Sequence, residues 1–191
     1  RENEQEKRNR HIEKIKSSVK QLNDILEDFL SLGKLDEGKV EVQTTLFDLD
    51  EFINETVEDM KGLFKKDQQI IYDHVGENKV ISDKKMLKNI LINLISNAIK
   101  FSEERAIIEI KSIGKDSVAS IAIKDQGIGI SEEDQKHLFT SFFRGKNATN
   151  IKGTGLGLHI VKRYVDLLGG DIYLHSELDK GTTIRVNIPI K

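Results

Sequence analysis

The stretch GTGLGLHIVKRY, residues 153–164, joins a glycine-rich loop to the start of an amphipathic helix. Its three glycines allow the backbone to approach a ligand closely. The amides at the following helix N-terminus favour an anion, and phosphate is the natural candidate. The spacing matches neither the G-x-x-x-x-G-K-[ST] phosphate loop nor the G-x-G-x-x-G dinucleotide motif. Taken alone, the stretch fits an anion site and an ordinary glycine-rich helix start equally well.

The composition fits one domain with an appendage. Among the 191 residues, 37% are hydrophobic and 32% are charged, and the net charge is −2. This balance gives no reason to expect nucleic acid as a partner. The lack of cysteine excludes disulfides and cysteine-based zinc sites. No apolar stretch approaches the ~18 residues of a membrane span. We therefore expect a cytoplasmic segment without membrane contact, whether or not the full-length protein is membrane-anchored.

Residues 1–38 are expected to form one long helix. Apolar residues recur there at spacings of three and four, namely Ile12, Ile15, Val19, Leu22, Leu26, Phe29 and Leu32. A lone amphipathic helix cannot bury such a stripe. We therefore expect partner helices, from a second chain or from residues upstream, and we take the chain to be part of a longer protein.

Residues 39–191 are expected to form an α+β domain. Strands are predicted at 40–49, 69–75, 79–83, 106–113, 118–125, 171–177 and 182–190. Helices are predicted from Asp48 or Asp50 to about 64, at 84–100, near 132–139 and at 154–168. The strands 69–75 and 79–83 are expected to pair as a hairpin. This grouping favours one mixed sheet with helices on one face. The long connection 126–153 is typical of a functional loop.

The helical stretch NLISNAIKFS, residues 93–102, places Asn93, Asn97 and Lys100 on one face. The amide oxygen of Asn97 suits a hard cation such as Mg²⁺. Lys100 can meet a phosphate as a point charge. Taken alone, exposed polar residues are the simpler interpretation, although apolar residues flank this face.

Two further stretches accompany strands. In DQGIGI, residues 125–130, Asp125 follows a strand and can accept a hydrogen bond from an exocyclic amine such as that of adenine. Gly127 and Gly129 allow the backbone to come close to a flat ring. In KGTTIRV, residues 180–186, Thr182 offers a hydroxyl. Each stretch alone is better explained as an ordinary turn.

Together, the four ordered stretches resemble the N, G1, G2 and G3 boxes of the GHKL ATP-binding family. That family includes sensor histidine kinases, type II topoisomerases, Hsp90 chaperones and MutL mismatch-repair proteins. The segment HLFTSFFRG, residues 137–145, resembles the F box of histidine kinases. The resemblance covers roughly residues 40–191 and implies the Bergerat fold, an α/β sandwich, with ATP and Mg²⁺ as ligands.

The resemblance also implies roles for individual residues. Asn97 coordinates Mg²⁺, while Asn93, Lys100 and, on the lid 131–153, Arg144 act at the phosphates. The adenine side consists of Asp125, Gly127, Gly129, Ile130 and Thr182. The phosphate loop consists of Gly153, Thr154, Gly155, Leu156, Gly157 and Leu158.

Two features indicate which branch of the family the chain resembles. Relatives that hydrolyse ATP carry a glutamate where this chain has Asn93, and an amide cannot act as a general base. The helix 1–38 resembles the second helix of a kinase dimerisation domain, which implies a homodimer and a response regulator as partners. The phosphoacceptor motif, similar to H-E-[aliphatic]-[KR]-[TN]-P, is absent, and His11 lacks the proline. The alternatives are a non-catalytic ATP-binding module or, with less support, a GHKL ATPase.

Overall fold

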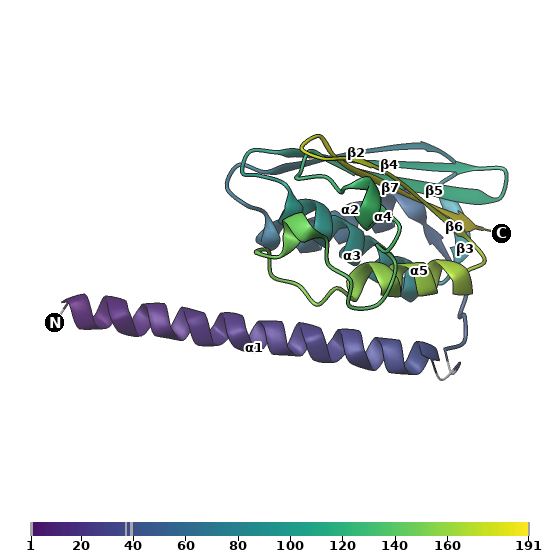
Figure 1. Ribbon diagram of the computed structural model, residues 1–191. Coiled ribbons are helices and arrows are strands. Elements are labelled where there is room, and N and C mark those ends of the chain that lie inside the picture. Colours follow the sequence, from purple (N-terminus) through teal and green to yellow (C-terminus); the bar gives the residue numbers. More distant parts are fainter. Residues whose placement is uncertain (1, 37, 39, 191) are drawn as a thin grey trace. The chain divides into compact units, whose positions relative to one another are not determined.

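The computed structural model describes residues 2–36, 38 and 40–190. The chain divides into two units, residues 1–40 and residues 41–191. The first unit contains one helix, α1 (Glu2–Asp36). The second contains every strand and all remaining helices of the described residues (Figure 1).

The helix α1 is continuous, as its apolar spacing predicts. Six side chains of the predicted stripe are 48–68% exposed, namely Ile12, Ile15, Val19, Leu22, Leu26 and Phe29. Their alternating spacings of three and four are those of helices that pack side by side. Among the residues that the structure describes, no helix combines the length and apolar character that crossing a bilayer requires.

The second unit is built on a five-stranded sheet with the order β2-β4-β5-β7-β6. The strands are β2 (Gln69–Gly76), β4 (Ile107–Lys115), β5 (Val118–Asp125), β6 (Asp171–Glu177) and β7 (Gly181–Pro189). The β2–β4 pair is parallel, whereas the other pairs are antiparallel. The sheet is therefore mixed, and the predicted α+β class is confirmed.

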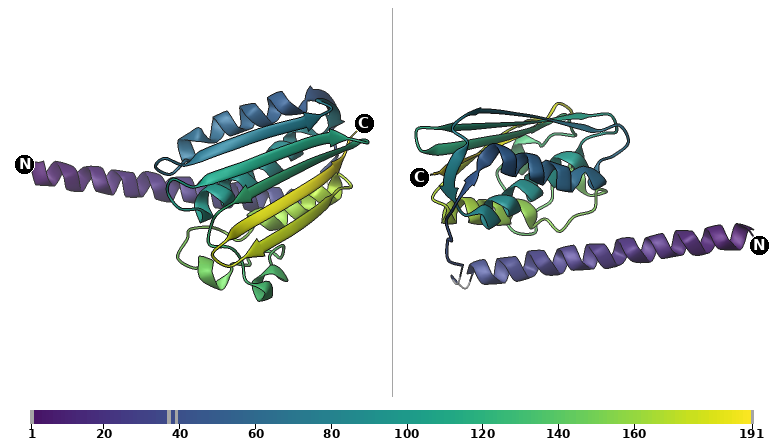
Figure 2. Two further views of the ribbon diagram at one scale, coloured as in Figure 1. Left: turned by 90° about the horizontal axis from the view of Figure 1, so that it is seen from above. Right: turned by 180° about the vertical axis from the view of Figure 1, so that it is seen from behind.

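Three helices cover one face of this sheet, whereas no helix of the unit's described residues crosses the other face (Figures 1 and 2). They are α2 (Leu49–Met60), α3 (Lys84–Phe101) and α5 (Gly157–Leu167). Carboxylates fix two of the starts, because Asp48 accepts a hydrogen bond from the Glu51 amide and Asp83 from the amides after it. The core between the layers includes Leu87, Leu91 and Ile95 of α3 and Ile108 and Ile121 of the sheet.

The predicted hairpin of residues 69–75 and 79–83 is wrong. The strand β3 (Lys79–Ser82) instead pairs antiparallel with β1 (Thr45–Asp48) in a separate two-stranded sheet. The Glu77 amide still donates to the Gly114 carbonyl, at 2.8 Å, so the chain extends the β2–β4 ladder before leaving the sheet. Val80 and Ser82 then become buried. Both segments alternate as strands do, and alternation does not specify the partner strand.

Several element boundaries also differ from the predictions. Regular strand pairing covers only residues 45–48 of the predicted strand 40–49. The helix α2 ends at Met60 and continues as a 3₁₀ turn, η1 (Lys61–Leu63). The short helix α4 is limited to Glu132–Gln135, and η2 (Lys146–Ala148) follows in the same connection. The helix α5 begins at Gly157 instead of residue 154, so the glycine-rich loop is longer than predicted.

Candidate functional site

The glycine-rich loop lies along the polar face of α3. A β-carbon added to Gly157 would sit 2.6 Å from Asn93 Oδ1, and one added to Gly153 would sit 2.9 Å from Lys100 Nζ. Asn97 lies between Asn93 and Lys100 on the same helix face, because residues three and four apart are neighbours there. The loop therefore runs antiparallel to the helix, and the structure brings the first and third predicted stretches together.

Leu156 anchors the loop in the core, and the helix α5 that follows the loop begins without a side-chain cap among the described residues. Leu156 is 2% exposed, and its amide donates to Thr154 Oγ1 at 3.1 Å, whereas Leu158 is half-buried. Gly155 has φ +75°, and an added β-carbon would meet the Phe143 carbonyl at 2.7 Å, so a side chain is excluded there. Within the part of the chain that the structure describes, no side chain caps α5, whereas α2, α3 and α4 each have a side-chain cap. Its first amides therefore remain available to an anion.

The two asparagines offer amide oxygens beside this loop. Asn93 donates from Nδ2 to the Asn89 carbonyl at 3.0 Å, which leaves its Oδ1 directed at Gly157. Asn97 is half-buried, and its side-chain amide makes no hydrogen bond with the described residues. Nor do the described residues include a cluster of three histidine, cysteine or acidic side chains suited to a metal. The donors fit a hard cation that also takes oxygens from a phosphate ligand.

Asp125 ends β5 opposite Thr182 of β7. Its Oδ1 accepts hydrogen bonds from the Gly127 amide at 2.9 Å and the Thr182 amide at 3.2 Å. Burial raises the pKa of this carboxyl, and the two backbone hydrogen bonds offset part of the rise. Both bonds use one oxygen, so within the described residues Oδ2 has no partner and can accept from a ligand.

The glycines after Asp125 are needed for contacts within the protein. An added β-carbon would sit 2.5 Å from the Phe101 carbonyl at Gly127 and 1.9 Å from the Glu177 carbonyl at Gly129. Gly129 also has φ +62°. The close approach predicted toward a flat ring is therefore seen, in this structure, toward protein backbone.

Ser176 on β6 is part of the site's support and was not predicted from sequence. Its Oγ accepts from the Ile130 amide at 2.9 Å, donates to the Gly181 carbonyl at 3.0 Å and lies 2.8 Å from Thr182 Oγ1. Ser176 thus links Ile130, in the segment that follows Asp125, to Thr182 of β7 through hydrogen bonds. The inward position of Ser176 in an alternating strand was the only sequence signal.

The lid, residues 131–153, is held by its own polar contacts. Arg144 Nη2 donates to the carbonyls of Ala148, Thr149 and Ile151 at 2.5–3.0 Å. Lys146 forms an ion pair with Glu133 at 2.9 Å. Arg144, which is predicted to act at the phosphates, therefore stabilises the lid itself in this structure, and its guanidinium faces lid carbonyls.

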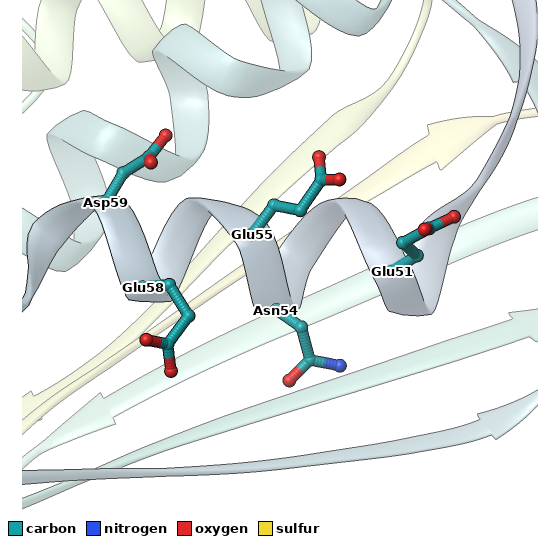
Figure 3. A pocket seen from close by; sticks show the side chains of 5 residues that line it. All are labelled: Glu51, Asn54, Glu55, Glu58 and Asp59. Carbon is teal, nitrogen blue, oxygen red and sulfur yellow. The ribbon is translucent and has the colours of Figure 1, made fainter.

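An open groove along α2 is chemically different from this region. It is lined by Glu51, Asn54, Glu55, Glu58 and Asp59 (Figure 3). Lys88 of α3 pairs with Asp59 at 2.8 Å, and Lys84 pairs with Glu55 at 4.0 Å. Four carboxylates repel a phosphate ligand. The groove includes none of the residues predicted to bind a nucleotide.

Comparisons with known proteins agree with the fold and the motif order. The chain is 31% identical over 192 residues to histidine protein kinase DivJ of Caulobacter vibrioides, covering 94% of this chain and 31% of DivJ. It is 35% identical over 189 residues to signal transduction histidine-protein kinase BarA of Escherichia coli, covering 93% of this chain and 20% of BarA. The chain thus spans a third or less of either relative.

Solved structures share the architecture. The Acinetobacter baumannii histidine kinase AdeS matches with a TM-score of 0.75 at 24% identity, covering 91% of this chain and 80% of that one. Residues 82–191, more than half of the chain, match the family described as histidine kinase-, DNA gyrase B- and HSP90-like ATPase. The chain belongs to this family, and its ATP-binding catalytic region is of the histidine kinase kind.

Proposed function

We propose that this chain is the catalytic region of a sensor histidine kinase, which binds MgATP and passes the γ-phosphoryl group to a histidine outside the chain. The observation that carries the proposal is the glycine-rich loop lying along the Asn93–Lys100 face of α3. Asp125 recognises the adenine amine through Oδ2, with Gly127, Gly129, Ile130 and Thr182 forming its surroundings.

On the phosphate side, the six residues 153–158 surround the triphosphate with backbone amides and the open start of α5. Asn97, assisted by Asn93, holds Mg²⁺, and Lys100 meets a phosphate oxygen. The ion, when bound, neutralises charge on the phosphate oxygens. Arg144 acts at the phosphates once hydrogen bonds to phosphate oxygens replace its hydrogen bonds to the lid carbonyls.

Transfer to histidine is favoured over hydrolysis by the chemistry at Asn93. Phosphoryl transfer needs chiefly positioning and charge stabilisation, which amides, amide oxygens and Lys100 supply. Attack by water also needs a base, and an amide does not remove a proton from water at neutral pH. An imidazole is already nucleophilic and needs no such base.

The remaining proposals concern the whole protein. The exposed stripe of α1 fits a homodimer in which helices from two chains pack together. A response regulator receiver domain then takes the phosphoryl group. The region acts in the cytoplasm, and neither nucleic acid nor membrane contacts it.

Incubation with γ-labelled ATP tests the proposal in two samples. The longer protein that contains this chain should acquire an acid-labile label on histidine, and Asp125→Asn should acquire much less. The 191-residue chain alone should release almost no phosphate. Steady phosphate release by the chain would instead indicate an ATPase, and MgATP binding without either activity would indicate an interaction module.

A further inference from the structure

The C-terminal end of α3 is held by side chains from a distant segment. The last carbonyls of a helix have no partner within the helix. Here Lys65 Nζ, from the segment between η1 and β2, donates to the Lys100 carbonyl at 2.9 Å and the Ser102 carbonyl at 2.5 Å. A cation at this end also interacts favourably with the helix dipole.

Gln68 completes this contact from inside the protein. It is 6% exposed, and each end of its amide is used. Its Nε2 donates to the carbonyls of Ile99 at 3.1 Å and Glu103 at 2.9 Å, while its Oε1 accepts from the Lys65 amide at 2.9 Å. We call Lys65 and Gln68 the α3 clamp.

The clamp itself is tied to the sheet. The Gln69 amide donates to the Ala106 carbonyl at 3.1 Å, and the Arg105 amide donates to the Lys66 carbonyl at 3.0 Å. From there the parallel pair of β2 and β4 begins, with Gln69 opposite Ile107. The end of α3 is therefore fixed relative to the sheet.

This helix end joins the two sides of the candidate site. Lys100 belongs to the phosphate side, and the next carbonyl, that of Phe101, accepts from the Ile128 amide at 3.3 Å. Gly127 packs so closely on the same carbonyl that an added β-carbon would lie 2.5 Å from it. Loosening of this end would therefore weaken the Phe101–Ile128 contact, which sets the spacing between Lys100 and the segment that follows Asp125.

We propose that Lys65 and Gln68 are positioning residues for nucleotide binding, which keep the phosphate side and the adenine side at the spacing of one ATP molecule. This inference rests on the proposed function. ATP is an adenosine linked to phosphates, and the gain from linking two bound groups depends on the spacing of their sites. Clamp loss therefore weakens ATP binding and leaves adenosine binding intact, whereas a general loss of folding weakens both.

The test compares Lys65→Met with Lys66→Met in the 191-residue chain. Methionine keeps an unbranched apolar stem without the ammonium group, and Lys66 is an exposed neighbour. Affinities for adenosine and for MgATP are measured by ligand-observed NMR and calorimetry, with thermal unfolding as the check on folding. We expect MgATP to bind Lys65→Met roughly fivefold to tenfold more weakly, the scale of one lost hydrogen bond. Adenosine should bind as in the wild type, and Lys66→Met should be unchanged for both ligands.

The outcomes separate the two proposals. Equal MgATP affinity in Lys65→Met and wild type overturns the clamp, as does an equal proportional loss for both ligands. Failure of the wild type to bind MgATP overturns the proposed function instead. Gln68→Met, if it folds, should show the same selective loss, and if it unfolds the result with Lys65→Met decides.

Discussion

Replacing Gly157 with alanine should weaken nucleotide binding without lowering the stability of the fold. The added carbon would lie 2.6 Å from Asn93 Oδ1, whereas ordinary contact begins at 3.4 Å. The Asn93 amide must therefore withdraw by the difference, about 0.8 Å. Because the neighbour is the end of a side chain, the backbone can stay in place. Alanine in a helix is also favoured over glycine by up to about 1 kcal/mol.

We therefore expect Gly157→Ala to keep or raise the melting temperature and to bind MgATP about tenfold more weakly, a loss of about 1.4 kcal/mol. Displacements of this size in a binding constellation cost as much as about 100-fold in rate. Calorimetry and thermal unfolding measure the two effects. Gly62→Ala is the matched control, since nothing lies within 4 Å of its added carbon. Wild-type affinity in Gly157→Ala would show that Asn93 and the loop do not act on one ligand.

Three further predictions concern single positions. Asn97→Ala should remove the dependence of ATP affinity on Mg²⁺, so that ATP with and without the ion binds alike in calorimetry; a persistent Mg²⁺ effect would contradict the metal role. Because the pKa of Asp125 is raised, lowering the pH should weaken adenosine binding before the pH reaches 3.8, the pKa of an ordinary aspartate. Burial disfavours the ionised form of Asp125. The protonated carboxyl therefore contributes fully to folding stability below pH 3.8, and this contribution is lost as the pH rises through the pKa of Asp125 in the folded state. Asp125→Asn should therefore bind adenosine weakly without that added pH dependence and should melt no lower at neutral pH; unchanged affinity would refute the adenine role. Leu22→Lys on α1 should raise the dissociation constant of a dimer about tenfold or more in light scattering, whereas exposed Glu13→Lys, off the stripe, should not.

The parts of the fold that sequence predicts here depend on local patterns. The apolar spacing of α1 and the start of the helix predicted at residue 84 each depend on a few neighbouring residues, and both occur in the structure. The glycine-rich loop and the polar face of α3 were predicted from separate stretches, and packing of α3 against α5 brings them together.

The parts that sequence did not predict depend on distant contacts. The strand β3 pairs with β1 and not with β2. Alternation marks a segment as a strand but does not specify which strand it pairs with. Ser176 supports Ile130 across 46 positions, and Gln68 reaches Ile99 across 31. Arg144 forms hydrogen bonds within its own lid, because three lid carbonyls lie near its guanidinium. Sequence spacing does not encode any of these partners.

The nucleotide site is tested most directly by calorimetric titration of the 191-residue chain with the Mg²⁺ complex of a non-hydrolysable ATP analogue. We predict one site per chain, filled at or below about millimolar ligand, the range typical of enzyme substrates. Adenosine should compete for that site. The absence of binding at millimolar analogue would contradict a nucleotide site between Asp125 and Asn97.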